Sequence, residues 1–225
     1  MSKIADKTTA KGLIEKIAAL KKTETAKAVK KRMAEFKSFS KKSANAWFSE
    51  LCFCILTANS KALTALKIQK ELGSSDAYGF LNYSQKKISA VIRKNRHRFH
   101  KIKSGYIVSA RSHKDIKHTI TKMINSGKSQ EEIREFIVKS IKGIGYKEAS
   151  HFLRNTGFFE LAILDRHILS LLKENSYISN IPKPLTKKSY IEIEKIFKTI
   201  AKKLKISPAE LDLYMWSLKT GKVLK

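Results

Sequence analysis

The chain has 225 residues, of which 42% are hydrophobic, and it carries 47 Lys and Arg against 19 Asp and Glu, a formal net charge of +28. This apolar content excludes wholesale disorder and is sufficient for a buried core. The charge excess is larger than an enzyme for neutral substrates needs, and it predicts a polyanionic partner, because phosphates neutralised by Lys or Arg release condensed counterions. The alternative is a lysine-rich surface that serves solubility alone.

Membrane insertion and secretion have no support in the sequence. No apolar run approaches the roughly 18 residues that a spanning helix requires. The first six residues lack the apolar core of a signal peptide. We therefore expect no membrane partner, a location in the cytoplasm and nucleoid (the nucleus if the source has one), and a monomer without an obligate protein partner.

The first half of the chain has the periodicity of helices. Apolar residues recur at spacings of three and four, and no convincing strand alternation is found, which predicts an all-α fold. The stripe at 47–56 is apolar enough to belong to a central helix. Gly73 and Gly127 are expected to end helices. The apolar stripes span residues 13–20, 29–36, 47–56, 63–66, 88–92, 106–110 and 116–124.

The second half carries clearer helix-start signals. Ser129 with Glu132 has the spacing of a capping box. Asp165 is a suitable N-cap, and so is Ser207, which a proline follows at the first helical position. The apolar stripes of the helices expected in this half span residues 133–141, 149–153, 168–172 and 193–200.

The cysteines and histidines do not predict a metal or cofactor. Cys52 and Cys54 stand two apart on an expected helix, so their side chains point to different sides and should not bridge. Two thiolates cannot make a four-cysteine iron–sulfur site. His97 and His100 lie in a basic stretch that would repel a cation, and we interpret them as phosphate-facing or solvated.

The segment 141–149 predicts a helix, a tight hairpin and a second helix. Gly143 and Gly145 permit backbone angles that other residues resist and leave room for close approach. Ile144 between them should point inward and fix the hairpin to the core. The second helix begins there with free N–H groups that suit a DNA phosphate. An ordinary helix–helix turn is the alternative interpretation.

This hairpin resembles that of the helix-hairpin-helix DNA glycosylase superfamily, which includes endonuclease III and the 8-oxoguanine glycosylases. The superfamily pattern places its catalytic lysine on Lys147. Its catalytic aspartate follows about eighteen residues later, and Asp165 stands 18 positions after Lys147. Ile163 and Leu164 precede this aspartate where the superfamily often has Gly-Pro or Gly-Val.

The finer resemblance is to the archaeal type of 8-oxoguanine DNA glycosylase/AP lyase, and it extends along nearly the whole chain. It rests on residues 55–60, residues 164–167 and the ending from Trp216 to Lys225. It implies a helical bundle at 44–157 that ends with the hairpin, and a second helical domain from 1–43 plus 158–225. It also implies an interdomain cleft lined by the lysine and the aspartate.

The chemistry that this resemblance implies begins with a base flipped out of the duplex. The carboxylate of Asp165 would stabilise positive character on the sugar and help to deprotonate the nucleophile. Lys147 would attack the anomeric carbon, expel the base and form a Schiff base, and elimination would cut the strand. Lysines are so common here that Lys142 could be mistaken for the nucleophile, and Asp165 could be only a helix cap.

Four further residues are expected at the substrate. Asn59 falls where the superfamily fills the gap beside the orphaned cytosine, or it caps a helix starting at Ser60. The terminal carboxylate of Lys225 is implied to bind the damaged guanine, with Trp216 as a stacking face; a frayed tail and a core tryptophan are the alternative. Phe99 is a second candidate for stacking, or a core residue.

We therefore expect a bifunctional enzyme without cofactors that acts on double-stranded DNA containing 8-oxoguanine. Two alternatives stay open. One is an endonuclease III-like glycosylase for oxidised pyrimidines. The other is a non-catalytic helix-hairpin-helix DNA-binding protein.

Overall fold

The computed structural model describes the backbone of residues 7–223 and the side chains of residues 12–223. Within these residues the chain is helical and contains no strand, which confirms the all-α prediction. It divides into two compact units, one of Ser38–Gly157 and the other of Met1–Lys37 with Phe158–Lys225. No helix in the described range has the length and apolar character to cross a membrane.

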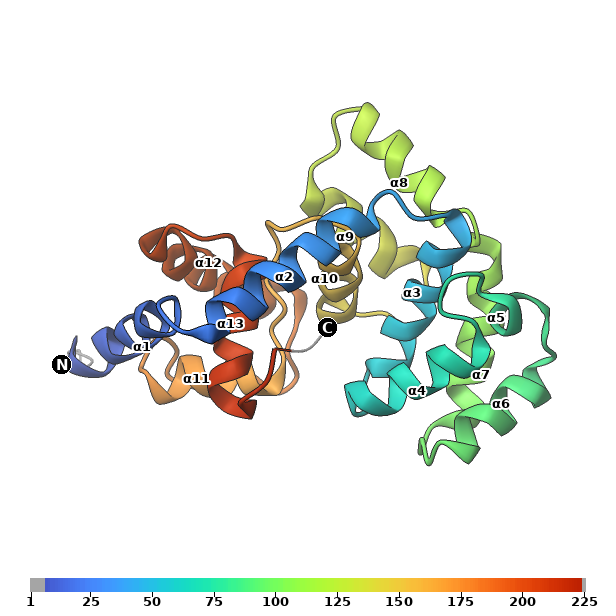
Figure 1. Cartoon of the computed structure of the whole chain (residues 1–225), viewed down its shortest axis with the longest axis horizontal. Coiled ribbons are helices and arrows are strands. Elements are labelled where there is room, and N and C mark those ends of the chain that lie inside the picture. Colours follow the sequence, from blue (N-terminus) through green and yellow to red (C-terminus); the bar gives the residue numbers. More distant parts are fainter. Residues whose placement is uncertain (1–6, 224–225) are drawn as a thin grey trace. The chain divides into compact units, whose positions relative to one another are not determined.

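The unit of Ser38–Gly157 is built around one helix, α3, and Figure 1 shows α4, α7, α8 and α10 around it. The side chains of α3 are buried from Ala46 to Thr57, so this helix is apolar on every face, as a central helix must be. The helices of the unit are α3 (Ala44–Thr57), α4 (Ala62–Leu72), α5 (Tyr78–Asn82), α6 (Gln85–Lys94), α7 (His100–Ala110), η1 (Arg111–His113), α8 (Ile116–Asn125), α9 (Gln130–Ser140) and α10 (Tyr146–Asn155).

A buried polar network holds α10 against α3 and α4. The carboxylate of Glu50 is fully buried and accepts hydrogen bonds from Asn155 Nδ2 at 2.6 Å and from Gln69 Nε2 at 3.3 Å. Because a buried carboxylate is costly without such partners, the network favours one arrangement of these three helices. It therefore helps to fix the position of the hairpin that leads into α10.

The C-terminal end of α3 is closed partly by its own last turn and partly by the segment 97–103 of the same unit. The last four carbonyls of a helix lack partners inside the helix. Here they accept hydrogen bonds from four donors, two of which belong to basic side chains in the segment 97–103. The pairs are Cys54 O with Thr57 Oγ1, Ile55 O with Lys103 Nζ, Leu56 O with His97 Nε2, and Thr57 O with Ser60 N.

The second unit contains both ends of the chain. In it α11 and α12 pack against α13, and α1 contacts α12 and α13 (Figure 1). A backbone hydrogen bond from Ala209 N to Phe159 O ties the start of α13 to the loop before α11. Its helices are α1 (Lys7–Leu20), α2 (Glu24–Phe39, which runs into the other unit), α11 (Arg166–Glu174), α12 (Lys187–Leu204) and α13 (Pro208–Thr220).

The extended segment that leads to α11 is held by α12. Glu194 accepts a hydrogen bond from Ala162 N at 2.8 Å. The hydroxyl of Tyr190 donates to Ala162 O at 2.8 Å and accepts from Leu164 N at 3.3 Å. Residues 161–164 are buried, so the backbone enters Asp165 from a fixed direction.

Candidate active site

The predicted hairpin is formed by the turn between α9 and α10. Ile144 at its tip is buried, with 5% of its surface exposed, so the inward direction predicted for it is confirmed. The hydroxyl of Tyr146 at the start of α10 donates to the carboxylate of Glu135 on α9. The N-cap of α10 is Gly145, which has no side chain to satisfy the first N–H groups of the helix.

The two glycines of the hairpin have different roles. Gly143 has a φ of +82°, and a Cβ added there would lie 2.2 Å from the Tyr106 ring on α7. Gly145 has a φ of −99° and extended backbone, and its Cβ would meet only Glu148 Oε2 at 3.4 Å. The prediction of a special backbone angle is therefore right for Gly143 and wrong for Gly145, whose missing side chain leaves an exposed surface open.

The pair supplies a matched stability test. We expect Gly143→Ala to lower the free energy of unfolding by about 2 kcal/mol or more, from positive-φ strain and overlap with Tyr106. Gly145→Ala should cost within about 1 kcal/mol, because alanine fits there and is only a poorer N-cap than glycine. Urea unfolding of both variants measures the difference. Equal losses would show that the backbone angle of Gly143 is not what requires glycine.

Lys147 is the second residue of α10 and its side chain is 25% exposed. Its Nζ lies 3.5 Å from Glu148 Oε1, and the Glu148 side chain is 15% exposed. Lys147 is thus neither freely solvated nor sealed in the core, which suits an amine that has to reach a substrate.

A second lysine lies within electrostatic range of this pair. Lys103 on α7 is 5% exposed, and its Nζ donates to Ile55 O at 2.7 Å. The pKa of Lys103 is lowered, mainly because the side chain is buried. The positive charge of Lys147 also lowers this pKa, whereas the negative charge of Glu148 partly opposes the shift. A second positive charge is therefore present near Lys147. The sequence gives no signal that singles out Lys103 among so many lysines, whereas Glu148 could have been noticed as the residue directly after Lys147.

Asn59 lies in the turn that follows α3. It has a φ of +58°, a conformation that asparagine adopts more readily than most residues, and its side chain is exposed. The next helix begins only at Ala62, with Lys61 as N-cap, so the interpretation of Asn59 as a helix cap is wrong. Its amide accordingly faces solvent beside the closed end of α3.

Phe99 is half-buried at the N-cap position of α7. The guanidinium of Arg98 lies 4.9 Å from the centre of its ring. His97 contacts the same ring edge-on, with centroids 6.3 Å apart. His97 itself is 3% exposed, so its interpretation as a phosphate-facing or solvated residue is wrong. His100 is half-buried and pairs through Nδ1 with Ser89 Oγ at 2.9 Å.

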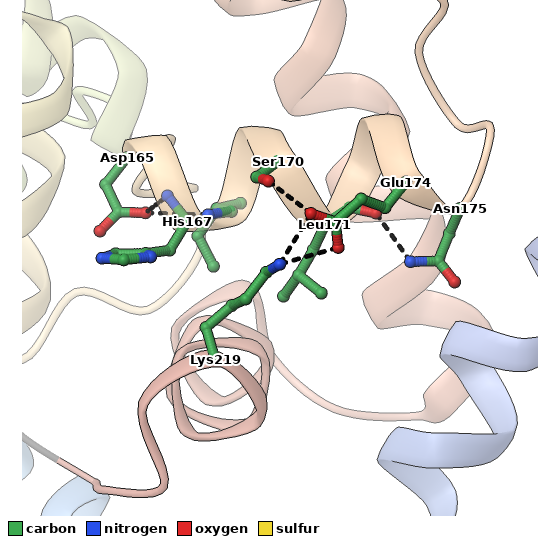
Figure 2. A network of polar contacts seen from close by, with 8 residues as sticks. Asp165, His167, Ser170, Leu171, Glu174, Asn175 and Lys219 are labelled. Atoms are coloured by element: carbon green, nitrogen blue, oxygen red, sulfur yellow. Dashed lines mark hydrogen bonds and ion pairs between the residues drawn. The ribbon is translucent and has the colours of Figure 1, made fainter.

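Asp165 is the N-cap of α11, as predicted. Its Oδ1 accepts hydrogen bonds from His167 N at 2.8 Å and Ile168 N at 2.9 Å (Figure 2). Its Oδ2 has no hydrogen-bond partner among residues 12–223, and the residue is half-buried. One oxygen thus serves the helix while the other is available to a ligand.

Trp216 lies close to this end of α11 in the same unit. The rings of His167 and Trp216 meet edge-on with centroids 6.3 Å apart. Lys219, one helical turn further on α13, donates to both carboxylate oxygens of Glu174 at 2.7 and 2.8 Å, as Figure 2 shows. Trp216 is half-buried, so it is not a fully enclosed core tryptophan. Lys225 lies outside the described residues.

The part of the chain that the structure describes holds no cluster of three or more His, Cys, Asp or Glu able to bind a metal. Cys52 and Cys54 are both buried, and no disulfide joins them. The candidate site residues therefore offer amines and carboxylates, with aromatic rings and an amide nearby. One unit contains Lys147, Glu148, Lys103, Asn59 and Phe99. The other unit contains Asp165 and Trp216.

Comparison with known proteins assigns the family. A sequence profile described as 8-oxoguanine DNA glycosylase matches residues 29–206. The chain is 49% identical to the 8-oxoguanine DNA glycosylase/AP lyase of Methanocaldococcus jannaschii over 213 residues, which are 95% of this chain and 99% of that protein. The chain belongs to the 8-oxoguanine DNA glycosylase family.

Solved structures of family members have the same fold. The Methanocaldococcus jannaschii glycosylase/lyase in complex with a 15-mer DNA containing 8-oxoguanine is 48% identical, with a TM-score of 0.88 over 95% of this chain and 99% of that one. The 8-oxoguanine DNA glycosylase of Thermotoga maritima is 36% identical, with a TM-score of 0.87 over 96% and 100% of the two chains. The family resemblance seen in the sequence is confirmed.

Proposed function

We propose that this chain removes 8-oxoguanine from double-stranded DNA and then cuts the strand at the abasic site. The observation that carries the proposal is its match, along 95% of its length, to a glycosylase/lyase that was solved with DNA containing this lesion. The charge of +28 suits a polyanionic substrate. The same proposal places the enzyme with genomic DNA in the cytoplasm and nucleoid.

Lys147 is the nucleophile in this proposal. Its neutral amine attacks the anomeric carbon of the flipped nucleotide, and the bond from that carbon to the base breaks with the electron pair leaving on the base. Loss of the amine proton and opening of the sugar give a Schiff base. Removal of a proton from the adjacent sugar carbon then expels the 3′ phosphate by β-elimination.

Asp165 supplies the negative charge that this chemistry needs. As the base departs, positive character builds on the sugar, and a carboxylate held in a fixed direction stabilises it without reorganising. The Oδ2 atom is suited to that role, because Oδ1 is occupied by two backbone N–H groups of α11. The same carboxylate can accept the proton that the lysine loses.

The remaining residues are proposed to hold the DNA and the base. Gly143, Ile144 and Gly145 present the first N–H groups of α10 to a phosphate. Phe99 and Trp216 offer stacking faces to the flipped base, and Asn59 fills the space beside the orphaned cytosine with an amide that both donates and accepts. The terminal carboxylate of Lys225 accepts hydrogen bonds from N1–H and the exocyclic amine of the damaged guanine.

The test is a panel of duplexes with 8-oxoguanine, with thymine glycol or without a lesion, each incubated with enzyme and borohydride. We expect a covalent protein–DNA adduct and strand cleavage with the 8-oxoguanine duplex alone. Preference for thymine glycol would instead indicate an enzyme for oxidised pyrimidines. Binding to all three duplexes without any adduct would indicate a non-catalytic DNA-binding protein.

A further inference from the structure

His97 makes two hydrogen bonds of opposite kind from a buried position. Its Nε2 lies 3.0 Å from Leu56 O at the end of α3, and its Nδ1 lies 3.2 Å from Phe99 N. A carbonyl oxygen can only accept, so Nε2 carries the hydrogen; a backbone N–H can only donate, so Nδ1 carries the lone pair. The surroundings therefore require the neutral Nε2–H tautomer of the ring.

The neutral imidazole links Phe99 to α3 through one hydrogen bond on each ring nitrogen. It holds the peptide nitrogen of Phe99, it touches the Phe99 ring edge-on, and it is anchored to Leu56. The neighbouring carbonyl of α3, Ile55 O, is bonded to Lys103, whose charge interacts with Glu148 and Lys147. The Phe99 backbone is thus tied to the end of α3 by hydrogen bonds, and the same helix end holds Lys103, whose charge interacts with that of Lys147.

We propose that His97 is a positioning residue for base excision, which acts by holding Phe99 where it stacks on the flipped 8-oxoguanine. This inference rests on the proposed function, in which Phe99 contacts the base. Reacting groups that are displaced by about 1 Å can lose about a hundredfold in rate, so a fixed platform for the base has a large effect on excision. His97 itself touches neither the base nor the sugar in this proposal.

The charges around His97 keep it in the form that this role requires. Burial lowers its pKa, the hydrogen bond to Leu56 opposes this, and the positive charges of Lys103, Arg98 and His100 lower it further. These cations come from its own segment and from α7. Protonation would put a hydrogen on Nδ1 facing Phe99 N–H and break this contact. Because the pKa of His97 is lowered, the ring should stay neutral, and the contact intact, on acidification to the usual pKa range of histidine.

The experiment compares two activities of the same variant. Excision of 8-oxoguanine needs a stacked base, whereas cleavage of a preformed abasic duplex has no base to stack. For His97→Leu we expect single-turnover excision to fall by about tenfold beyond any fall in abasic-site cleavage, since only excision depends on a base stacked on an aromatic ring. His97→Asn, whose amide oxygen can still accept from Phe99 N–H, should recover most of the excision rate.

A double-mutant cycle with Phe99→Leu decides whether the two residues act together. If His97 works through Phe99, the double variant excises 8-oxoguanine as slowly as the slower single variant. Equal loss of excision and abasic-site cleavage in both His97 variants, or additive effects with Phe99→Leu, would overturn the proposal. If His97→Leu is unfolded by circular dichroism, His97→Phe takes its place, because phenylalanine keeps an aromatic ring of similar size but cannot accept the hydrogen bond from Phe99 N–H. Absence of excision by the wild-type chain would instead refute the proposed function.

Discussion

Lys147→Gln is expected to abolish the borohydride-trapped protein–DNA adduct and to slow strand cleavage at least about a thousandfold, as loss of a catalytic nucleophile typically does. The glutamine amide is not a nucleophile and cannot form an imine, although its size is close to that of lysine. Single-turnover assays with an 8-oxoguanine duplex and gel analysis of the trapped complex measure both effects.

DNA binding should survive this change, because the variant removes only one of 47 Lys and Arg residues. Lys142 is the matched control. It lies on the same hairpin and is exposed, and Lys142→Gln should still form the adduct. Wild-type levels of trapping by Lys147→Gln, or loss of trapping in Lys142→Gln alone, would mean that the nucleophile is a different lysine.

Asp165→Asn is expected to separate the structural role of this residue from its chemical role. The amide oxygen of asparagine can accept the same two N–H groups of α11, and asparagine is as good an N-cap as aspartate. The fold should therefore be retained. The free carboxylate oxygen and its charge are lost, so excision should fall by about a thousandfold or more.

Asp165→Ala completes the comparison. This variant removes the cap as well as the charge and should lower the free energy of unfolding by about 0.5–2 kcal/mol. Thermal unfolding measures the cap, and single-turnover excision measures the chemistry. An asparagine variant with the excision rate of the wild type would reduce Asp165 to a helix cap.

Local signals in the sequence predicted the helix boundaries best. Ser129 with Glu132 forms the complete capping box that their spacing indicated. Ser207 accepts from Glu210 N with proline at the first position of α13, and Gly221 ends that helix in the left-handed conformation. These features depend on residues three or four apart, so their partners can be identified without knowledge of the fold.

Contacts between distant segments could not be predicted in the same way. His97 forms a hydrogen bond with Leu56, which lies 41 positions earlier in the chain. Lys103 forms one with Ile55, which lies 48 positions earlier. No spacing rule connects such pairs, and the basic stretch around His97 favoured a solvated interpretation. The five-residue helix α5 was also not predicted, because it is too short to show an apolar period. The proposed catalytic roles of Lys147 and Asp165 come from family resemblance, because the many lysines of this chain cannot be told apart by local sequence alone.

The position of the cysteines on α3 matters for an enzyme whose substrate arises by oxidation. Cys52 and Cys54 have no exposed surface, and burial raises the pKa of the Cys52 thiol well above its ordinary value. Oxidants such as peroxides attack the thiolate of accessible cysteines, so Cys52 is shielded both by its protonation state and by its depth. The chain has no other cysteine, and the repair protein should therefore keep its thiols reduced under the same stress that creates the lesion.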